Sequence, residues 1–192
     1  GDLRPVSPML SLGRRLGLWI AAGLVWGVIG LSWIGFRPDL TDKCVNVFFL
    51  LETAALVVLT GSVAVGSLKL AVPGETQSRS VFRWAIGAFA TWMGVVLFRF
   101  YTEWTRASGL ASTFDFHFVC SLLILGISIV PNMILAKLLA RGYTLDTRKA
   151  GILAGLASGA LGALCMQFVC THERPLHIVA WHALPVVISS AL

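Results

Sequence analysis

Residues 16–36 read LGLWIAAGLVWGVIGLSWIGF, an apolar run without a single charged side chain. A bilayer core about 30 Å thick is crossed by about 20 apolar residues in a helix that rises about 1.5 Å per residue. The run is too long for the apolar core of a signal peptide, and no obvious small-residue cleavage site follows it. We therefore predict that it crosses a membrane as one helix.

Further apolar runs follow at residues 45–72, 81–101, 116–140, 150–170 and from about 175 to 192. Polar turns separate them, and Pro38 and Pro73-Gly74 oppose a continued helix in the first two turns. The fold class predicted is an all-α membrane protein, a bundle of six transmembrane helices over residues 16–192. Residues 1–15 are expected to be the remnant of a cytoplasmic N-terminal segment.

The composition supports this class. Of 192 residues, 57% are hydrophobic and 12% are charged, whereas soluble domains have about 45–50% apolar and about 25% charged residues. A soluble domain and a disordered chain are both excluded on this ground. In a membrane protein the net charge of +6 reports orientation and contact with anionic lipids rather than binding to nucleic acid. If six helices alternate, ten of the 15 Lys and Arg residues fall on the side of the N-terminus, so both termini are predicted to be cytoplasmic.

Small residues predict which helix lies at the centre. Gly151, Gly155 and Gly159 recur every four residues in the fifth run, a spacing that lets helix backbones approach closely in lipid. In the first run, Trp19, Trp26 and Trp33 recur every seven residues and form one stripe, which favours packing or interfacial anchoring. Pro131-Asn132 predicts a kink in the fourth run.

All cysteines and histidines of the chain map to the ends of the predicted helices, or the loops, on the side opposite the N-terminus. They are Cys44, Cys120, Cys165, Cys170, His117, His172, His177 and His182. Thiolates and imidazoles bind soft or borderline metals, and thiols are also attacked by oxidants. The only cofactor that the residues suggest is therefore a divalent metal ion at this outer Cys/His cluster.

Spacing limits how such a site can form. His117 and Cys120 are three residues apart and share a helix face. Cys165 and Cys170 are five residues apart, about 140° around the helix axis, and are not expected to bind one ion together. A site has to form between helices, for example from Cys120 and Cys170 with His117 or His177. Three alternatives to a metal or redox site remain open. The cysteines only fill apolar space, the histidines only lie among the lipid head groups, or Cys120 and Cys170 form a structural disulfide.

Glu52 and Arg99 are ionisable residues inside predicted spans, and such residues are functional candidates. Glu52 and Arg99 are expected to form a buried ion pair that serves as a scaffold, or Arg99 extends its charged end towards the membrane interface. The other alternative is a role in transport of a solute or proton.

The stretch 170–182, CTHERPLHIVAWH, with Pro185 after it, resembles the C-terminal signature of the NrsF family. Residues 2–6 (DLRPV), 37–40 (RPDL) and 68–74 (LKLAVPG) agree, so the resemblance covers essentially the whole chain. The family consists of anti-sigma factors in the bacterial inner membrane that negatively regulate extracytoplasmic-function sigma factors.

The resemblance implies a sensor that holds its sigma factor at the membrane and releases it under stress. A cysteine pair at the positions of Cys120 and Cys170 is implicated in sensing oxidants or heavy metals. Cys44 and Cys165 do not match the family pattern. The sigma-binding part is the cytoplasmic N-terminal segment, of which only about fifteen residues precede the first span here.

Two other functions are weighed against this one. A small metal or solute transporter would use the outer Cys/His ring with Glu52, Asn46 and Asn132. An intramembrane thiol oxidoreductase is the weakest alternative, because the sequence has no CxxC pair. We therefore expect no enzymatic activity.

Overall fold

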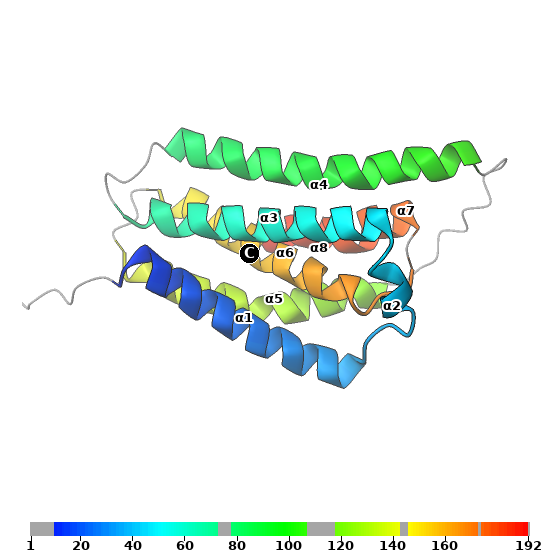
Figure 1. Ribbon diagram of the computed structural model, residues 1–192. Coiled ribbons are helices and arrows are strands. Elements are labelled where there is room, and N and C mark those ends of the chain that lie inside the picture. Colours follow the sequence, from blue (N-terminus) through cyan, green and yellow to red (C-terminus); the bar gives the residue numbers. More distant parts are fainter. Residues whose placement is uncertain (1–9, 73–77, 107–117, 143–145, 173, 192) are drawn as a thin grey trace, which may run out of the picture.

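The computed structural model describes residues 10–72, 78–106, 118–142, 146–172 and 174–191. Within these ranges the chain is all-helical, and its long helices run side by side along one direction (Figure 1). The long helices are α1 (Leu12–Ile34), α3 (Val47–Leu70), α4 (Ser78–Arg106), α5 (Phe118–Ala140) and α6 (Thr147–Gln167). Short helices are α2 (Leu40–Lys43), α7 (Pro175–His177), the π-helix η1 (Ile178–Ala183) and α8 (Leu184–Ser189).

Within the described ranges, five helices are long and apolar enough to cross a membrane, and they correspond to the first five predicted spans. The predicted sixth span appears as a shorter helical run through α7, η1 and α8. The boundary predicted at Cys170 is wrong, because α6 ends at Gln167 and Cys170 lies beyond it. The predicted N-terminal segment lies largely outside the described residues, which start at residue 10.

Helix α6 lies at the centre, as its glycines predicted, with 72% of its most apolar stretch buried. It packs against α3, α5 and α8, whereas α4 packs mainly on α3. Gly155 and Gly159 touch α8, and Gly162 touches α5, but Gly151 is exposed with no neighbour within 4 Å of a Cβ placed there. The predicted close-packed stripe is therefore confirmed for all but its first glycine.

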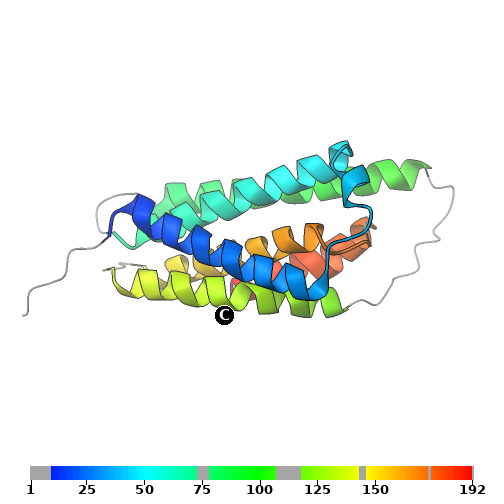
Figure 2. The ribbon, with the colours of Figure 1, turned by 60° about the horizontal axis from the view of Figure 1, so that its bottom comes forward.

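The tryptophan stripe of α1 runs from the core to the surface. Trp19 is 2% exposed, Trp26 is half-buried, and Trp33 is 88% exposed. Figure 2 shows α1 crossing obliquely in front of the other helices, and the Trp19 indole N–H donates to the Pro131 carbonyl of α5 at 3.1 Å. The stripe thus packs at one end and is exposed at the other.

Replacing Trp19 by phenylalanine is expected to lower the free energy of unfolding by about 1 kcal/mol, because the Pro131 carbonyl loses its indole donor. Trp26→Phe is the matched control, since the buried Trp26 N–H has no hydrogen-bond partner among the described residues. Unfolding in mixed detergent micelles compares the two. Equal losses in both variants would contradict a role for the Trp19–Pro131 hydrogen bond.

Candidate functional site

Four metal-binding side chains converge at the end of the bundle where α5 begins and α6 ends. They are Cys120 in the first turn of α5, Cys170 just after α6, His177 in α7 and His182 in η1. Their sulfur and nitrogen atoms all lie within 4.8 Å of one another. Cys120 is half-buried and the other three are buried. Residues that the sequence places up to sixty-two positions apart therefore form one cluster.

The spacing inside this Cys/His cluster matches that of a tetrahedral metal site. The sulfur atoms of Cys120 and Cys170 are 3.8 Å apart, and the Cys170 sulfur is 3.4 Å from Nε2 of His177. Two thiolates at about 2.3 Å from a tetrahedral ion lie about 3.8 Å apart, and a thiolate and an imidazole lie about 3.5 Å apart. A disulfide needs about 2.05 Å, so the two thiols are free here and do not form the structural bridge. The residues present fit a metal ion of the zinc type.

The electrostatics of the cluster favour a charged sulfur at Cys170. A hydrogen bond from the Cys120 thiol, with a further one from His177, lowers the pKa of Cys170 against the opposing effect of burial. The thiolate is the form that binds metals and reacts with oxidants. His182 is only 3% exposed, and among the described residues neither of its ring nitrogens has a hydrogen-bond partner. A buried polar group without a partner is costly, so His182 has an unused capacity to coordinate.

The chain that carries Cys170 is braced by the connection after α1. The backbone N–H of Arg37 donates to the Phe168 carbonyl at 3.0 Å. The Arg37 guanidinium forms two hydrogen bonds to Asp39, at 2.7 and 2.9 Å, and lies 5.9 Å from the centre of the Phe49 ring. This guanidinium holds the pKa of Asp39 below its usual value. Arg37 is not among the candidate site residues predicted from the sequence, although its place in the RPDL stretch that carries the family resemblance is a usable signal.

The other predicted cysteines lie outside the cluster. Cys44 is exposed between α2 and α3. Cys165 is buried in α6, where its sulfur lies 3.2 Å from the position of a Cβ on Gly27 of α1. Cys165 does not join Cys170 in the cluster, as expected for two cysteines five residues apart in the sequence.

The remaining histidines are His172 and His117. The His172 ring stacks on that of His177 at 5.4 Å, beside the cluster. His117 lies outside the described residues, so its predicted part in the site stays a prediction.

Glu52 and Arg99 form the ion pair that was predicted as one alternative. Arg99 Nη1 of α4 lies 3.3 Å from Glu52 Oε1 of α3, and both side chains are at least nine-tenths buried. Asn46, a candidate for a transport pathway, caps α3 by accepting hydrogen bonds from the N–H groups of Phe48 and Phe49. Glu52 and Arg99 thus link α3 to α4, and Asn46 caps the start of α3.

Comparisons with known proteins identify a family. No curated protein and no solved structure matches the chain. The family model described as "NrsF: Negative regulator of sigma F" matches residues 1–192, the whole chain. Because the match extends over the entire sequence, the chain belongs to the NrsF family of negative regulators of sigma F.

Proposed function

We propose that this protein is an anti-sigma factor of the bacterial inner membrane. It holds an extracytoplasmic-function sigma factor on the cytoplasmic side and releases it when Cys120 and Cys170 meet an oxidant or a heavy metal. The observation that carries this proposal is the convergence of the two thiols with His177 and His182 at one end of the bundle. The family adds the partner class, a sigma factor.

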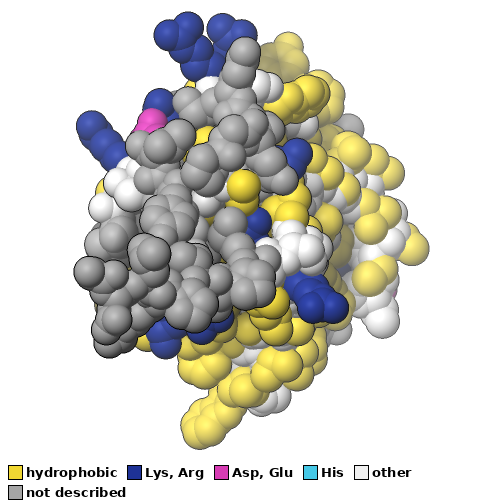
Figure 3. Space-filling view, turned by 90° about the vertical axis from the view of Figure 1, so that its left-hand side faces the viewer, with side chains coloured by type: hydrophobic (Ala, Val, Ile, Leu, Met, Phe, Trp, Pro, Cys, Tyr) yellow, Lys and Arg dark blue, Asp and Glu magenta, His cyan; other side chains and the backbone are white. Residues whose placement is uncertain are grey.

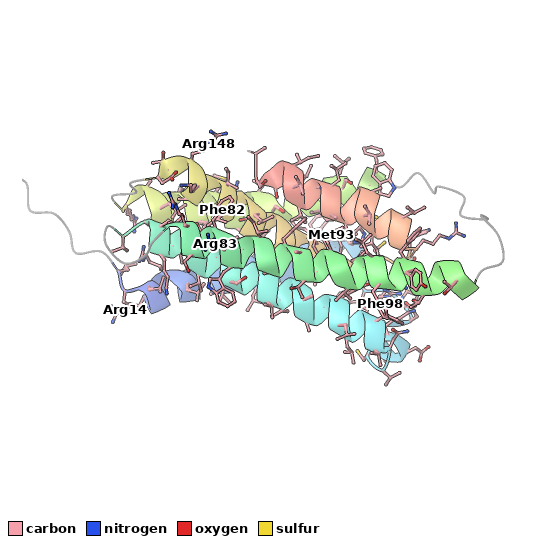
Figure 4. The ribbon with its side chains drawn as sticks, turned by 90° about the horizontal axis from the view of Figure 1, so that it is seen from above. Arg14, Phe82, Arg83, Met93, Phe98 and Arg148 are labelled. Atoms are coloured by element: carbon pink, nitrogen blue, oxygen red, sulfur yellow. The ribbon has the colours of Figure 1, made fainter. Side chains whose placement is uncertain are left out.

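The distribution of charge supports the orientation. Exposed Lys and Arg side chains surround the end of the bundle where α1 begins (Figure 3). Arg14, Arg83 and Arg148 come from three different helices and lie towards that end, whereas Phe98 lies towards the other (Figure 4). In the proposed topology the basic end faces the cytoplasm, the run from α7 to α8 is the sixth span, and the Cys/His cluster faces outwards.

Two chemical events fit the cluster. A soft or borderline divalent cation displaces the thiol protons and joins two helices and the C-terminal run through thiolates and imidazoles. Alternatively, a two-electron oxidant joins the two sulfurs, both thiol protons leave, and the sulfurs close from 3.8 Å to about 2.05 Å. Either event releases a partner only through its free-energy difference between two states, about 2.7 kcal/mol for a hundredfold change in affinity.

The double variant Cys120→Ser/Cys170→Ser is expected to lose the response, because a serine hydroxyl is a poor ligand for soft metals and forms no disulfide. We expect at least tenfold weaker Co²⁺ binding in lipid nanodiscs, followed by the absorption of tetrahedral thiolate coordination. Sigma-dependent reporter transcription should stay at its unstressed level with metal or peroxide. Cys44→Ser is the matched control, since Cys44 is exposed outside the cluster, and it should respond normally.

A normal response in the double variant would refute the thiol mechanism. The transporter hypothesis makes a separate prediction, metal uptake by protein-containing liposomes. We expect no uptake above that of empty liposomes, because Glu52 is engaged by Arg99. Uptake that depends on Glu52 would favour transport over signalling.

A further inference from the structure

The π-helix η1 is the feature that brings the two histidines of the cluster together. His177 and His182 are five residues apart, and five residues on an α-helix are about 140° apart around its axis. In η1 the N–H of Leu184 bonds to the carbonyl of Val179, five residues back. A π-helix closes its turn over this spacing, so residues five apart lie on the same side. In this register both imidazoles reach the thiols.

One contact from α5 supports the π register. Pro185 has no N–H, so it cannot donate to the carbonyl of Trp181 as a residue four positions later does in an α-helix. The hydroxyl of Ser121 donates to that carbonyl at 3.0 Å. Because Ser121 is the neighbour of Cys120, the first turn of α5 contacts η1 through both the cluster and this hydrogen bond.

The same register sets how α8 sits on α6. The Ser189 hydroxyl donates to the Gly155 carbonyl at 2.9 Å, and the Cα of Val186 lies 3.0 Å from the position of a Cβ on Gly159. If η1 changed to an α-helix, the residues after it would turn by about 100° and shift by about 1.5 Å. Ser189 would then leave Gly155, so the histidines and the α8 contact change together.

We propose that η1 is a register switch that couples the Cys/His cluster to the position of α8, an inference that rests on the proposed function. In the π register His182 faces the thiols and α8 is seated on Gly155 and Gly159. In the α register His182 turns away and α8 rotates. A metal ion that needs all four ligands stabilises the π register, because it binds that state better than the other. The buried ring nitrogens of His182 have no hydrogen-bond partner among the described residues, which makes the π register costly without the ion.

Deletion of Ala180 tests the switch. Without Ala180, an α-helix places the two histidines four residues apart on one face and keeps α8 in its seat. The deletion variant should bind Zn²⁺ at least as tightly as the wild type, since no change of register precedes binding. In nanodiscs, Zn²⁺ should slow amide hydrogen exchange in residues 178–189 by about tenfold in the wild type. In the variant, exchange should be slow with and without Zn²⁺.

Ser121→Ala is the second variant, and it provides the deciding test in case the deletion variant does not fold. It should weaken Zn²⁺ binding about fivefold without removing a ligand, and Ser32→Ala, which loses only a hydroxyl bonded to its own helix, should not. The switch is refuted if the deletion variant shows the wild-type slowing by Zn²⁺, or if Ser121→Ala binds Zn²⁺ as the wild type does. Failure of the proposed function gives a different result: neither Zn²⁺ nor peroxide would change sigma-dependent reporter transcription in the wild type, whatever the hydrogen exchange of residues 178–189 shows.

Discussion

Replacing Glu52 by leucine is expected to lower the free energy of unfolding by about 3–5 kcal/mol. Glu52 is 1% exposed and pairs with Arg99 between α3 and α4. Removing one partner of a buried ion pair costs about 3–5 kcal/mol, because the desolvation of the remaining charge is then offset less. Unfolding by a denaturing detergent in mixed micelles measures the loss.

The double variant Glu52→Leu/Arg99→Leu should recover most of this loss, because apolar side chains often replace a whole buried pair without cost. Lys149→Leu is the surface control. It breaks the pair of Lys149 with Asp146, whose side chains are 41% and 33% exposed, and should cost less than about 1 kcal/mol. A loss below about 1 kcal/mol in Glu52→Leu would show that the ion pair does not hold α4 on α3.

Gly155→Ala should cost about 2–3 kcal/mol, the second large effect. A Cβ on Gly155 would meet the backbone of Ser189, with the carbonyl carbon at 2.7 Å and the Cα of Ser190 at 2.8 Å. Backbone atoms cannot turn aside as the end of a flexible side chain can, so α8 has to move away from α6. Detergent unfolding gives the loss, and hydrogen exchange should be faster in residues 184–189.

Gly151→Ala provides the matched control on the same helix. No atom lies within 4 Å of a Cβ at Gly151, and alanine favours a helix over glycine by about 1 kcal/mol. The control should therefore be neutral or stabilising. Equal destabilisation by the two substitutions would indicate that α8 does not pack on Gly155.

Much of the architecture could be predicted from the sequence, because lipid requires long apolar helices that satisfy their own backbone groups. The five long helices, the central position of α6 and the Glu52–Arg99 pair follow from this constraint. The predicted helix ends were less accurate, because apolar residues continue past the last helical turn. Val169 and Cys170 extend the apolar run, yet α6 ends at Gln167.

The candidate site could be predicted only in part. Cys120 and Cys170 were expected to meet, with His117 or His177, but the place of His182 depends on a π-helix. The geometry that separated Cys165 from Cys170 would also have separated His177 from His182, since both pairs are five apart. Hydropathy does not reveal a change from i→i+4 to i→i+5 hydrogen bonds. Pro185 was visible in the sequence, but its partner Ser121 depends on tertiary packing.

The order in which the chain is synthesised gives the cluster a further property. Three of its four members, Cys170, His177 and His182, follow all five long helices in the sequence. A nascent chain that has inserted those helices but has not yet emerged beyond residue 167 contains only one of the four ligands. In the proposed function such a chain cannot respond to the stress, and it begins to respond only when residues 168–182 have left the ribosome and docked.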